Sequence, residues 1–249
     1  MKDMIILAET VEGKRNKERG RGNQDVIGVF QDNRIVCASV NDGCSGCEYP
    51  RLAGEINAKI AETTARKMEE QLFYEQQFKR SIAQEYKKAM ELSGAPLNEL
   101  CSTTAFVAID KLSYSYIAFT CGDSGILSFD TSLKVRCFLE PKSGFRKSLT
   151  YFTNDAFAVQ NVGEFRQGRL GSDIAGFILY TDGADTISDS LHDRDNPAER
   201  LLHAVYSDMY ESEKDRLISE IITRTSDDIS VIIVAPTDDP RQLSAIHSS

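Results

Sequence analysis

Short acidic patches recur where apolar, strand-like runs of this chain begin or end. They are Asn-Gln-Asp at 23–25, Asn-Asp-Gly at 41–43, Thr-Asp-Gly at 181–183 and Ser-Asp-Asp at 226–228. Carboxylates that converge in a fold repel one another unless they are protonated or bridged by cations, and their oxygens suit hard ions such as Mg²⁺ or Mn²⁺. A single Asp-Gly after a strand is also a common turn. The repetition is what indicates a metal site.

The cysteines suggest a second kind of chemistry. Cys44 and Cys47 have Cys-x-x-Cys spacing, which is typical of a redox pair or of half a zinc site. No second such pair is present and the three histidines have no ligand spacing, so structural zinc is disfavoured and a thiol redox module remains an alternative function. Cys37, Cys101 and Cys121 lie in or beside apolar runs and are predicted to be small core residues.

The composition is that of an ordinary globular protein. Of 249 residues, 41% are hydrophobic and 27% charged, so we expect one domain over residues 1–235 and a polar tail at 236–249. A formal net charge of -9 and the absence of Trp argue against binding to nucleic acid or to an anionic membrane. The sequence has no signal-peptide features and no apolar run that could span a bilayer, which favours a cytoplasmic protein with reduced thiols. No signal of oligomeric state is evident.

The elements that must position the acidic patches alternate between strands and helix pairs. Strands are predicted at 4–8, 26–30, 34–40, 176–180 and 229–235, with a meander at 102–109, 113–120, 126–129 and 133–139. Helices are predicted at about 51–72, 73–92, 197–209 and 211–223, and the segment 141–172 reads as irregular. This order predicts an α+β layered fold in which helices cover the outer faces of β-sheets.

Six short motifs resemble, in order, those of the metal-dependent protein phosphatases of type 2C, especially a divergent bacterial branch. They are the patch at 23–25, Val-Asn-Asp-Gly-Cys-Ser-Gly at 40–46, Cys-Ser-Thr-Thr-Ala at 101–105, Cys-Gly-Asp-Ser-Gly at 121–125, Tyr-Thr-Asp-Gly at 180–183 and Ser-Asp-Asp-Ile-Ser-Val-Ile-Ile-Val at 226–234. The resemblance spans about residues 5 to 235. Each motif is short, so the resemblance depends on the order of the six motifs and on their strand or helix context. It implies a four-layer αββα fold: a central antiparallel β-sandwich flanked by pairs of helices, with two divalent metal ions, Mn²⁺ or Mg²⁺, at one end.

The resemblance also implies roles for individual residues. Asp42 matches the carboxylate that bridges both metals, and Gly43 matches the residue that lends a backbone carbonyl to the second. Asp182 and Asp227 match the remaining ligands of the first metal, and Asp25 resembles a nearby acid that holds metal-bound water. The implied catalytic residues are Asp42, Asp182 and Asp227. A water that bridges the metals would attack phosphorus directly, without a phosphoenzyme.

The predicted function is therefore that of a bacterial-type signalling hydrolase. It would be a metal-dependent serine/threonine protein phosphatase that hydrolyses phosphoserine or phosphothreonine monoesters made by an opposing protein kinase.

The chain departs from the family pattern at three places, and the first two favour an alternative, a catalytically weak, pseudophosphatase-like module that binds phosphoproteins or regulators. Gln24 stands where better-known members carry Glu for the second metal, and Cys44 replaces a histidine that many eukaryotic members use as a candidate proton donor. Asp123 matches an acid of a third, weaker metal site, but Thr186 stands where its usual partner belongs and Asp185 falls one residue early. The retained ligand carboxylates oppose this alternative.

Basic residues near the motifs could contact the substrate. Arg19 and Arg21 flank the position of the family's phosphate-binding arginine, so one of them could hold the phosphate by a bidentate contact. The alternative is that residues 14–21 form a solvated basic loop. The segment 141–172 falls where the family has a mobile flap, and its basic residues could contact phosphopeptides or be plain surface charge. They are Lys142, Arg146, Lys147, Arg166 and Arg169.

Overall fold

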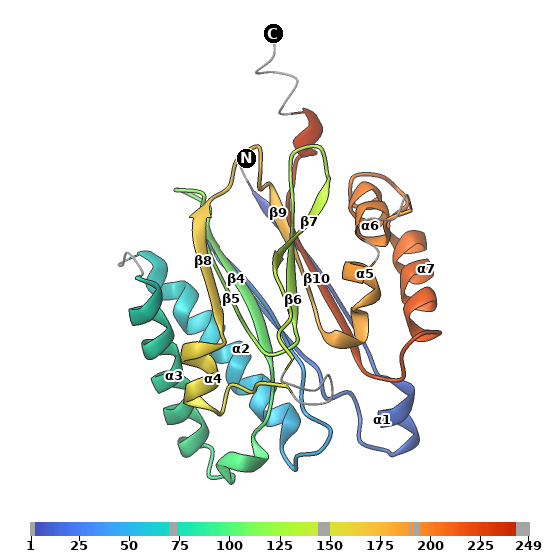
Figure 1. Cartoon of the computed structure of the whole chain (residues 1–249). Coiled ribbons are helices and arrows are strands. Elements are labelled where there is room, and N and C mark those ends of the chain that lie inside the picture. The colour runs from blue at the N-terminus through green and yellow to red at the C-terminus, as the bar shows by residue number, and fades with distance from the viewer. Residues whose placement is uncertain (1–2, 70–73, 144–149, 190, 192–194, 243–249) are drawn as a thin grey trace.

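Two five-stranded antiparallel sheets pack face to face, and helices cover the outer face of each (Figure 1). The computed structural model describes residues 3–69, 74–143, 150–189, 191 and 195–242. The predicted four-layer αββα sandwich is confirmed. None of the helices in these ranges is long and apolar enough to cross a membrane.

Each sheet joins strands from distant parts of the chain. The first contains, in spatial order, β1 (Met4–Val11), β10 (Ile229–Pro236), β9 (Gly176–Tyr180), β6 (Gly125–Phe129) and β7 (Val135–Leu139). The second contains β2 (Val26–Gln31), β3 (Ile35–Asn41), β4 (Thr104–Asp110), β5 (Ser115–Cys121) and β8 (Glu164–Arg169). Strands β3, β4, β6, β9 and β10 are buried along their whole lengths. Because a helix layer covers one face and the opposite sheet covers the other, these strands read as continuous apolar runs.

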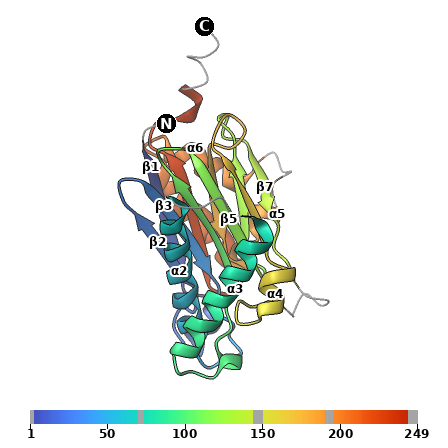
Figure 2. The ribbon, with the colours of Figure 1, turned by 90° about the vertical axis from the view of Figure 1, so that its left-hand side faces the viewer.

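The helices form one layer on each side of the sandwich. Over the second sheet lie α2 (Pro50–Arg66), α3 (Glu75–Leu92) and α4 (Ala156–Asn161), as the rotated view shows (Figure 2). Over the first sheet lie α5 (Thr186–Asp189), α6 (Pro197–Val205) and α7 (Tyr210–Ile222). The start of α6 follows from its sequence, since Asn196 caps the helix by accepting from the Ala198 N–H at 2.9 Å and Pro197 occupies the first turn.

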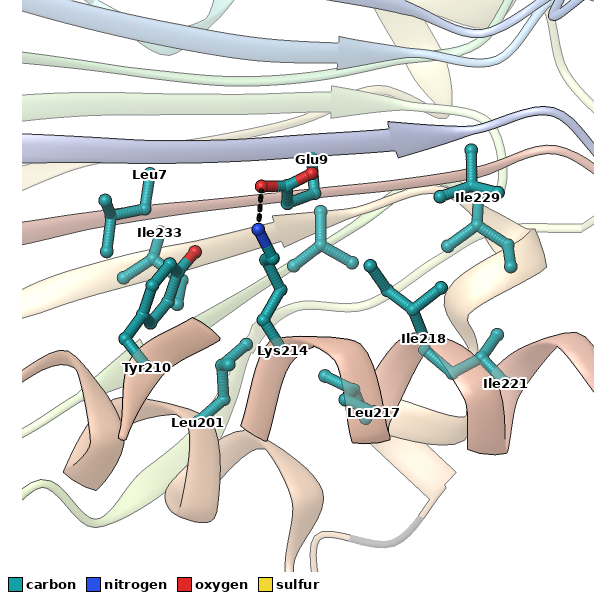
Figure 3. A pocket seen from close by; sticks show the side chains of 12 residues that line it. Leu7, Glu9, Leu201, Tyr210, Lys214, Leu217, Ile218, Ile221, Ile229 and Ile233 are labelled. Atoms are coloured by element: carbon teal, nitrogen blue, oxygen red, sulfur yellow. Dashed lines mark ion pairs between the residues drawn. The ribbon is translucent and has the colours of Figure 1, made fainter. Parts of the chain in front are cut away.

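An apolar layer joins α7 to the first sheet (Figure 3). Leu217 and Ile221 of α7 belong to the same buried cluster as Ile229 and Ile233 of β10. Polar groups reach this layer at an ion pair between Lys214 of α7 and Glu9 of β1, 3.0 Å apart. The amphipathic pattern of α7 accounts for this packing.

Several predicted elements were wrong. The segment 141–172 is not irregular throughout, because it contains α4 and the edge strand β8, whose sequence is too polar to stand out. The predicted meander is split, since β4 and β5 lie in the second sheet and β6 and β7 in the first. The short helices α1 (Lys14–Glu18) and α5 were not predicted, because neither is long enough to show an apolar stripe. Arg146, Lys147, His192 and His247 lie outside the described residues.

Candidate active site

Five acids from five different loops gather at one end of the sandwich. Asp42 follows β3, Asp182 begins a 3₁₀ turn (Asp182–Ala184) after β9, Asp123 lies between β5 and β6, Asp25 precedes β2, and Asp227 precedes β10. In each antiparallel pair, one strand ends where its neighbour begins. This topology brings the acidic patches of the sequence together at the lower end of the sandwich in Figure 1.

The electrostatics show how closely these acids crowd one another. Burial raises the pKa of the Asp42 carboxyl well above its usual value, and the charges of Asp25 and Asp182 raise it further. Burial and the charges of Asp123 and Asp227 likewise raise the pKa of Asp182 to about 8. The cluster therefore favours protons, or cations that take their place.

Asp25 lies at the buried edge of this cluster. Burial raises its pKa to about 7, although Thr181 donates a hydrogen bond to one carboxylate oxygen at 2.8 Å. The other oxygen, Oδ1, is buried and has no partner among the described residues.

Close backbone approaches require both glycines of the Asp-Gly motifs. A Cβ on Gly43 would lie 2.7 Å from the Gln24 carbonyl oxygen, and one on Gly183 would lie 1.9 Å from that of Asp228. The N–H of Thr103 donates to the Asp42 carbonyl oxygen at 2.9 Å. The loops that carry the acids are therefore fixed by packing and backbone hydrogen bonds.

Asp227 faces a cation of the chain itself. Arg15 of α1 donates from Nη2 to both carboxylate oxygens of Asp227, at 3.0 and 2.9 Å, and to the Ser45 hydroxyl at 2.7 Å. Sequence reasoning missed Arg15 because it treated residues 14–21 as one basic stretch. The sequence signal for Arg15 was its position four residues, or about one helical turn, before Arg19.

The other predicted site residues occupy different positions around the cluster. Arg21 donates to the Ser45 carbonyl oxygen, and Arg19 is exposed. Gln24 is buried, and its Oε1 has no partner in the described part of the chain. Cys44 is half-buried beside the Asp42 loop. The assignment of a phosphate-binding arginine therefore stays a prediction.

Outside the acidic cluster, two basic residues of the predicted flap contact the sandwich. Lys142 pairs with Glu164 at 2.5 Å, and the Arg166 guanidinium lies over the Phe138 ring, 5.1 Å from its centroid. Both engage β-strand residues, so their role in contacting substrate remains a prediction.

A model of the family described as protein phosphatase 2C matches residues 12–221. The chain belongs to this family. The resemblance read from the six motifs is confirmed, and the chain is assigned to the protein serine/threonine phosphatases. No curated protein sequence matches it.

Solved structures of type 2C-like phosphatases share the fold. The serine/threonine phosphatase of S. agalactiae is 17% identical, with a TM-score of 0.65 over 94% of this chain and 99% of that one. Stp1 of Staphylococcus aureus is 15% identical, with a TM-score of 0.62 over 96% of both chains. RsbX, solved in complex with magnesium, is 13% identical, with a TM-score of 0.58 over 93% of this chain and 94% of that one.

The acidic cluster fits the metal ions on which the protein phosphatase 2C family depends. Its candidate ligands are oxygen atoms, which hard divalent ions prefer, and Oδ1 of Asp25 and Oδ1 of Asp123 are buried without a partner in the described ranges. Among the described residues, no three His, Cys, Asp or Glu side chains are close enough to enclose an ion as they stand. Within the cluster, the Asp227 carboxylate is engaged by Arg15 of α1 at 2.9 Å.

Proposed function

We propose that the chain is an active, metal-dependent phosphatase that hydrolyses phosphoserine and phosphothreonine monoesters in proteins. The observation that carries this proposal is the crowding of Asp25, Asp42 and Asp182, whose pKa values are all raised by burial and by neighbouring carboxylates. A cluster of this kind lowers the stability of the fold, and groups with such raised pKa values are concentrated at functional sites. Its substrates would be the products of a protein kinase.

Asp42, Asp182 and Asp227 would hold one ion, and Asp42 and the Gly43 carbonyl would hold a second. Asp25 would accept a hydrogen bond from water at the cluster, and Asp123 lies close enough to add charge. When bound, divalent ions supply Lewis acidity that activates water and neutralises the phosphate. Mg²⁺ and Mn²⁺ are the ions that this ligand set suits.

The residues of the chain would position the substrate and exclude alternative nucleophiles. Arg15 contacts Asp227 and Arg21 contacts the Ser45 carbonyl oxygen, and Arg19 is exposed. A guanidinium beside the cluster would hold phosphate oxygens. Burial raises the pKa of the Cys44 thiol, so it is protonated at neutral pH and is a poor nucleophile and a poor proton donor. Solvent would then protonate the leaving alcohol.

Two observations favour the pseudophosphatase-like alternative. Arg15 already neutralises Asp227, and Gln24 supplies no charge beside the predicted second ion. A chain that binds metal weakly for these reasons would bind phosphoproteins without turning them over.

A metal titration of phosphopeptide hydrolysis distinguishes the two functions. Purified chain is freed of metal with a chelator and assayed against a phosphothreonine peptide over a range of Mn²⁺ and of Mg²⁺. The active enzyme shows saturable, metal-dependent phosphate release that EDTA abolishes, and calorimetry detects the same ions binding. Metal binding without turnover would favour the pseudophosphatase, and turnover that is insensitive to EDTA would contradict both.

A further inference from the structure

Three cysteines from two segments of the chain meet beside the candidate active site. Cys44 and Cys47 lie in the loop after β3, and Cys101 lies just before β4. The Cys44 N–H donates to the Cys101 carbonyl oxygen at 3.0 Å, and Gly43 and Ser102 form an antiparallel bridge. This short backbone ladder joins the Cys-x-x-Cys loop to a third thiol that the sequence did not associate with it.

Cys47 and Cys101 share one acceptor. Their thiols donate to the carbonyl oxygen of Asn98, at 3.8 and 3.3 Å respectively. Because both sulfur atoms contact the same oxygen atom, the two thiols lie on the same side of the loop that carries Asn98. The Asn154 side-chain amide donates to the Cys101 sulfur at 3.4 Å. The shared acceptor and the backbone ladder make Cys47 and Cys101 the candidate partners for a disulfide.

The remaining cysteines differ from this pair and provide internal controls. Cys37 and Cys121 are buried in the apolar layer under α2–α4, where oxidants do not reach them. Cys137 is exposed on β7. The Cys47 N–H donates to the Cys44 carbonyl oxygen at 3.0 Å, and the Cys-x-x-Cys spacing makes Cys44 the competing partner of Cys47.

We propose that Cys47 and Cys101 form a redox modification site that is oxidised reversibly by a low-molecular-weight disulfide. The Cys47 thiolate attacks one sulfur of the external disulfide, whose S–S bond breaks and releases one thiolate. The Cys101 thiolate then attacks the Cys47 sulfur, breaks the mixed disulfide and releases the second thiolate. The two protons lost by the protein thiols go to the two released thiolates. The external disulfide is reduced by two electrons and the protein pair is oxidised by two.

The surroundings of the pair determine when exchange occurs. Burial raises the pKa of Cys47 to about 11, and the neighbouring Cys101 thiol and the charge of Glu99 act in the same direction. The thiols are therefore protonated at neutral pH, and the reduced pair is the resting state in a reducing compartment. The rate of exchange should increase with pH until the attacking thiol is ionised.

The disulfide would cross-link the ladder that carries Asp42. The Thr103 N–H holds the Asp42 carbonyl oxygen two residues beyond Cys101. Oxidation would therefore fix the spacing between the acidic loop and β4. The modification itself does not depend on phosphatase activity, so it can fail or succeed separately from the proposed function.

The test uses the full chain and glutathione. Reduced protein is equilibrated with graded ratios of oxidised to reduced glutathione, trapped with an alkylating agent and digested for mass spectrometry. We expect a loss of two hydrogens, a Cys47–Cys101 linked peptide and full reversal by excess reductant. Cys44→Ser and the matched surface control Cys137→Ser should form the same link. Cys101→Ser should stop at a glutathione adduct on Cys47, and Cys47→Ser should give neither product at these positions.

Three results would overturn the proposal. They are a Cys44–Cys47 link in the wild-type chain, a glutathione adduct confined to Cys137, and a pair that stays reduced at every ratio. The wild-type peptide map decides among these even if a cysteine variant does not fold, and circular dichroism shows which variants are folded.

Discussion

Two acids at the same end of the sandwich have opposite surroundings. Asp228 is 3% exposed and accepts hydrogen bonds from the N–H of Gly13 and the N–H of Gln24, both at 2.6 Å, and from the Asn16 amide at 2.8 Å. Asp42 is bordered by carboxyl groups that raise its pKa. Three donors satisfy the oxygen atoms of Asp228, whereas Asp42 needs a proton or a cation.

This difference separates an acid that holds the scaffold together from an acid whose surroundings suit metal chemistry. Asp228 ties α1 and the start of β2 to the strand β10, so its charge is used to hold loops together. The Asp42 carboxyl group destabilises the metal-free fold. A bound cation would remove this repulsion, so the relief would add to the free energy of metal binding. Sequence alone does not distinguish these roles, because both acids belong to family motifs.

The largest expected effect is on turnover. Asp42→Asn should lower the rate of phosphopeptide hydrolysis by about a thousandfold at limiting metal, roughly 4 kcal/mol of activation free energy, because it removes the charge that bridges the two sites. The metal-free variant should melt at or above the wild-type temperature, since a repelling carboxyl is gone. Wild-type turnover in Asp42→Asn would contradict the assignment of the metal centre.

The counterpart change at Asp228 should affect folding. Asp228→Ala leaves three donors without their acceptor, and we expect a loss of about 3 kcal/mol in the free energy of unfolding, measured by urea denaturation. The control is Asp227→Ala, which removes a partly exposed ion pair and should cost less than about 1 kcal/mol. Equal losses in the two variants would remove the distinction between the neighbouring acids.

The stability of the metal-free protein should fall as the pH rises. The pKa of Asp25 is raised from 3.8 to about 7 and that of Asp182 to about 8, so the folded state binds these protons more tightly than the unfolded chain does. Their contribution is complete below the unfolded pKa and is lost as pH increases through about 7 to 8. We expect a decrease on the order of 2 kcal/mol between about pH 6 and about pH 8, followed by urea denaturation. Saturating Mn²⁺ should abolish the decrease, and a metal-free protein that is more stable at the higher pH would contradict the crowding of these acids.

The smallest expected effect concerns Arg15, the cation that already contacts the cluster. Arg15→Gln should tighten Mn²⁺ binding several-fold, about 1 kcal/mol in calorimetry, because the metal no longer competes with a guanidinium for Asp227. Arg21→Gln is the matched control, since Arg21 contacts the Ser45 carbonyl and no carboxylate of the cluster. Weaker binding in Arg15→Gln alone would mean that Arg15 supports the site rather than competing with its ion.

The sequence predicted the layers and the long elements well because their apolar patterns extend over many residues. The helix predicted at 51–72 is α2, and the strand predicted at 229–235 is β10. The short α1 and the edge strand β8 were missed, because neither buries enough apolar surface to leave a periodic signal.

The acids of the candidate site were found from their motifs, whereas their partners were not. Asp42 and Asp182 follow apolar strands, a local pattern that is visible in the sequence. Two contacts depend on which loops the sheets bring together. They are the ion pair between Arg15 and Asp227 and the shared hydrogen-bond acceptor of Cys47 and Cys101. Such contacts join segments far apart in the chain, and no local pattern encodes them.

The pairing of β1 with β10 has a consequence for folding. These strands pair from Met4 with Pro236 to Val11 with Ile229. The first strand of the described chain therefore has the last strand as its neighbour. Contacts of such high sequence separation form late, because closing the long intervening loop costs entropy first. During synthesis, β1 can pair with β10 only after the ribosome has made β10. The Asp228 hydrogen bonds that fix α1 form only then, so the end of the sandwich that carries the acidic cluster should be among the last parts of the molecule to become ordered.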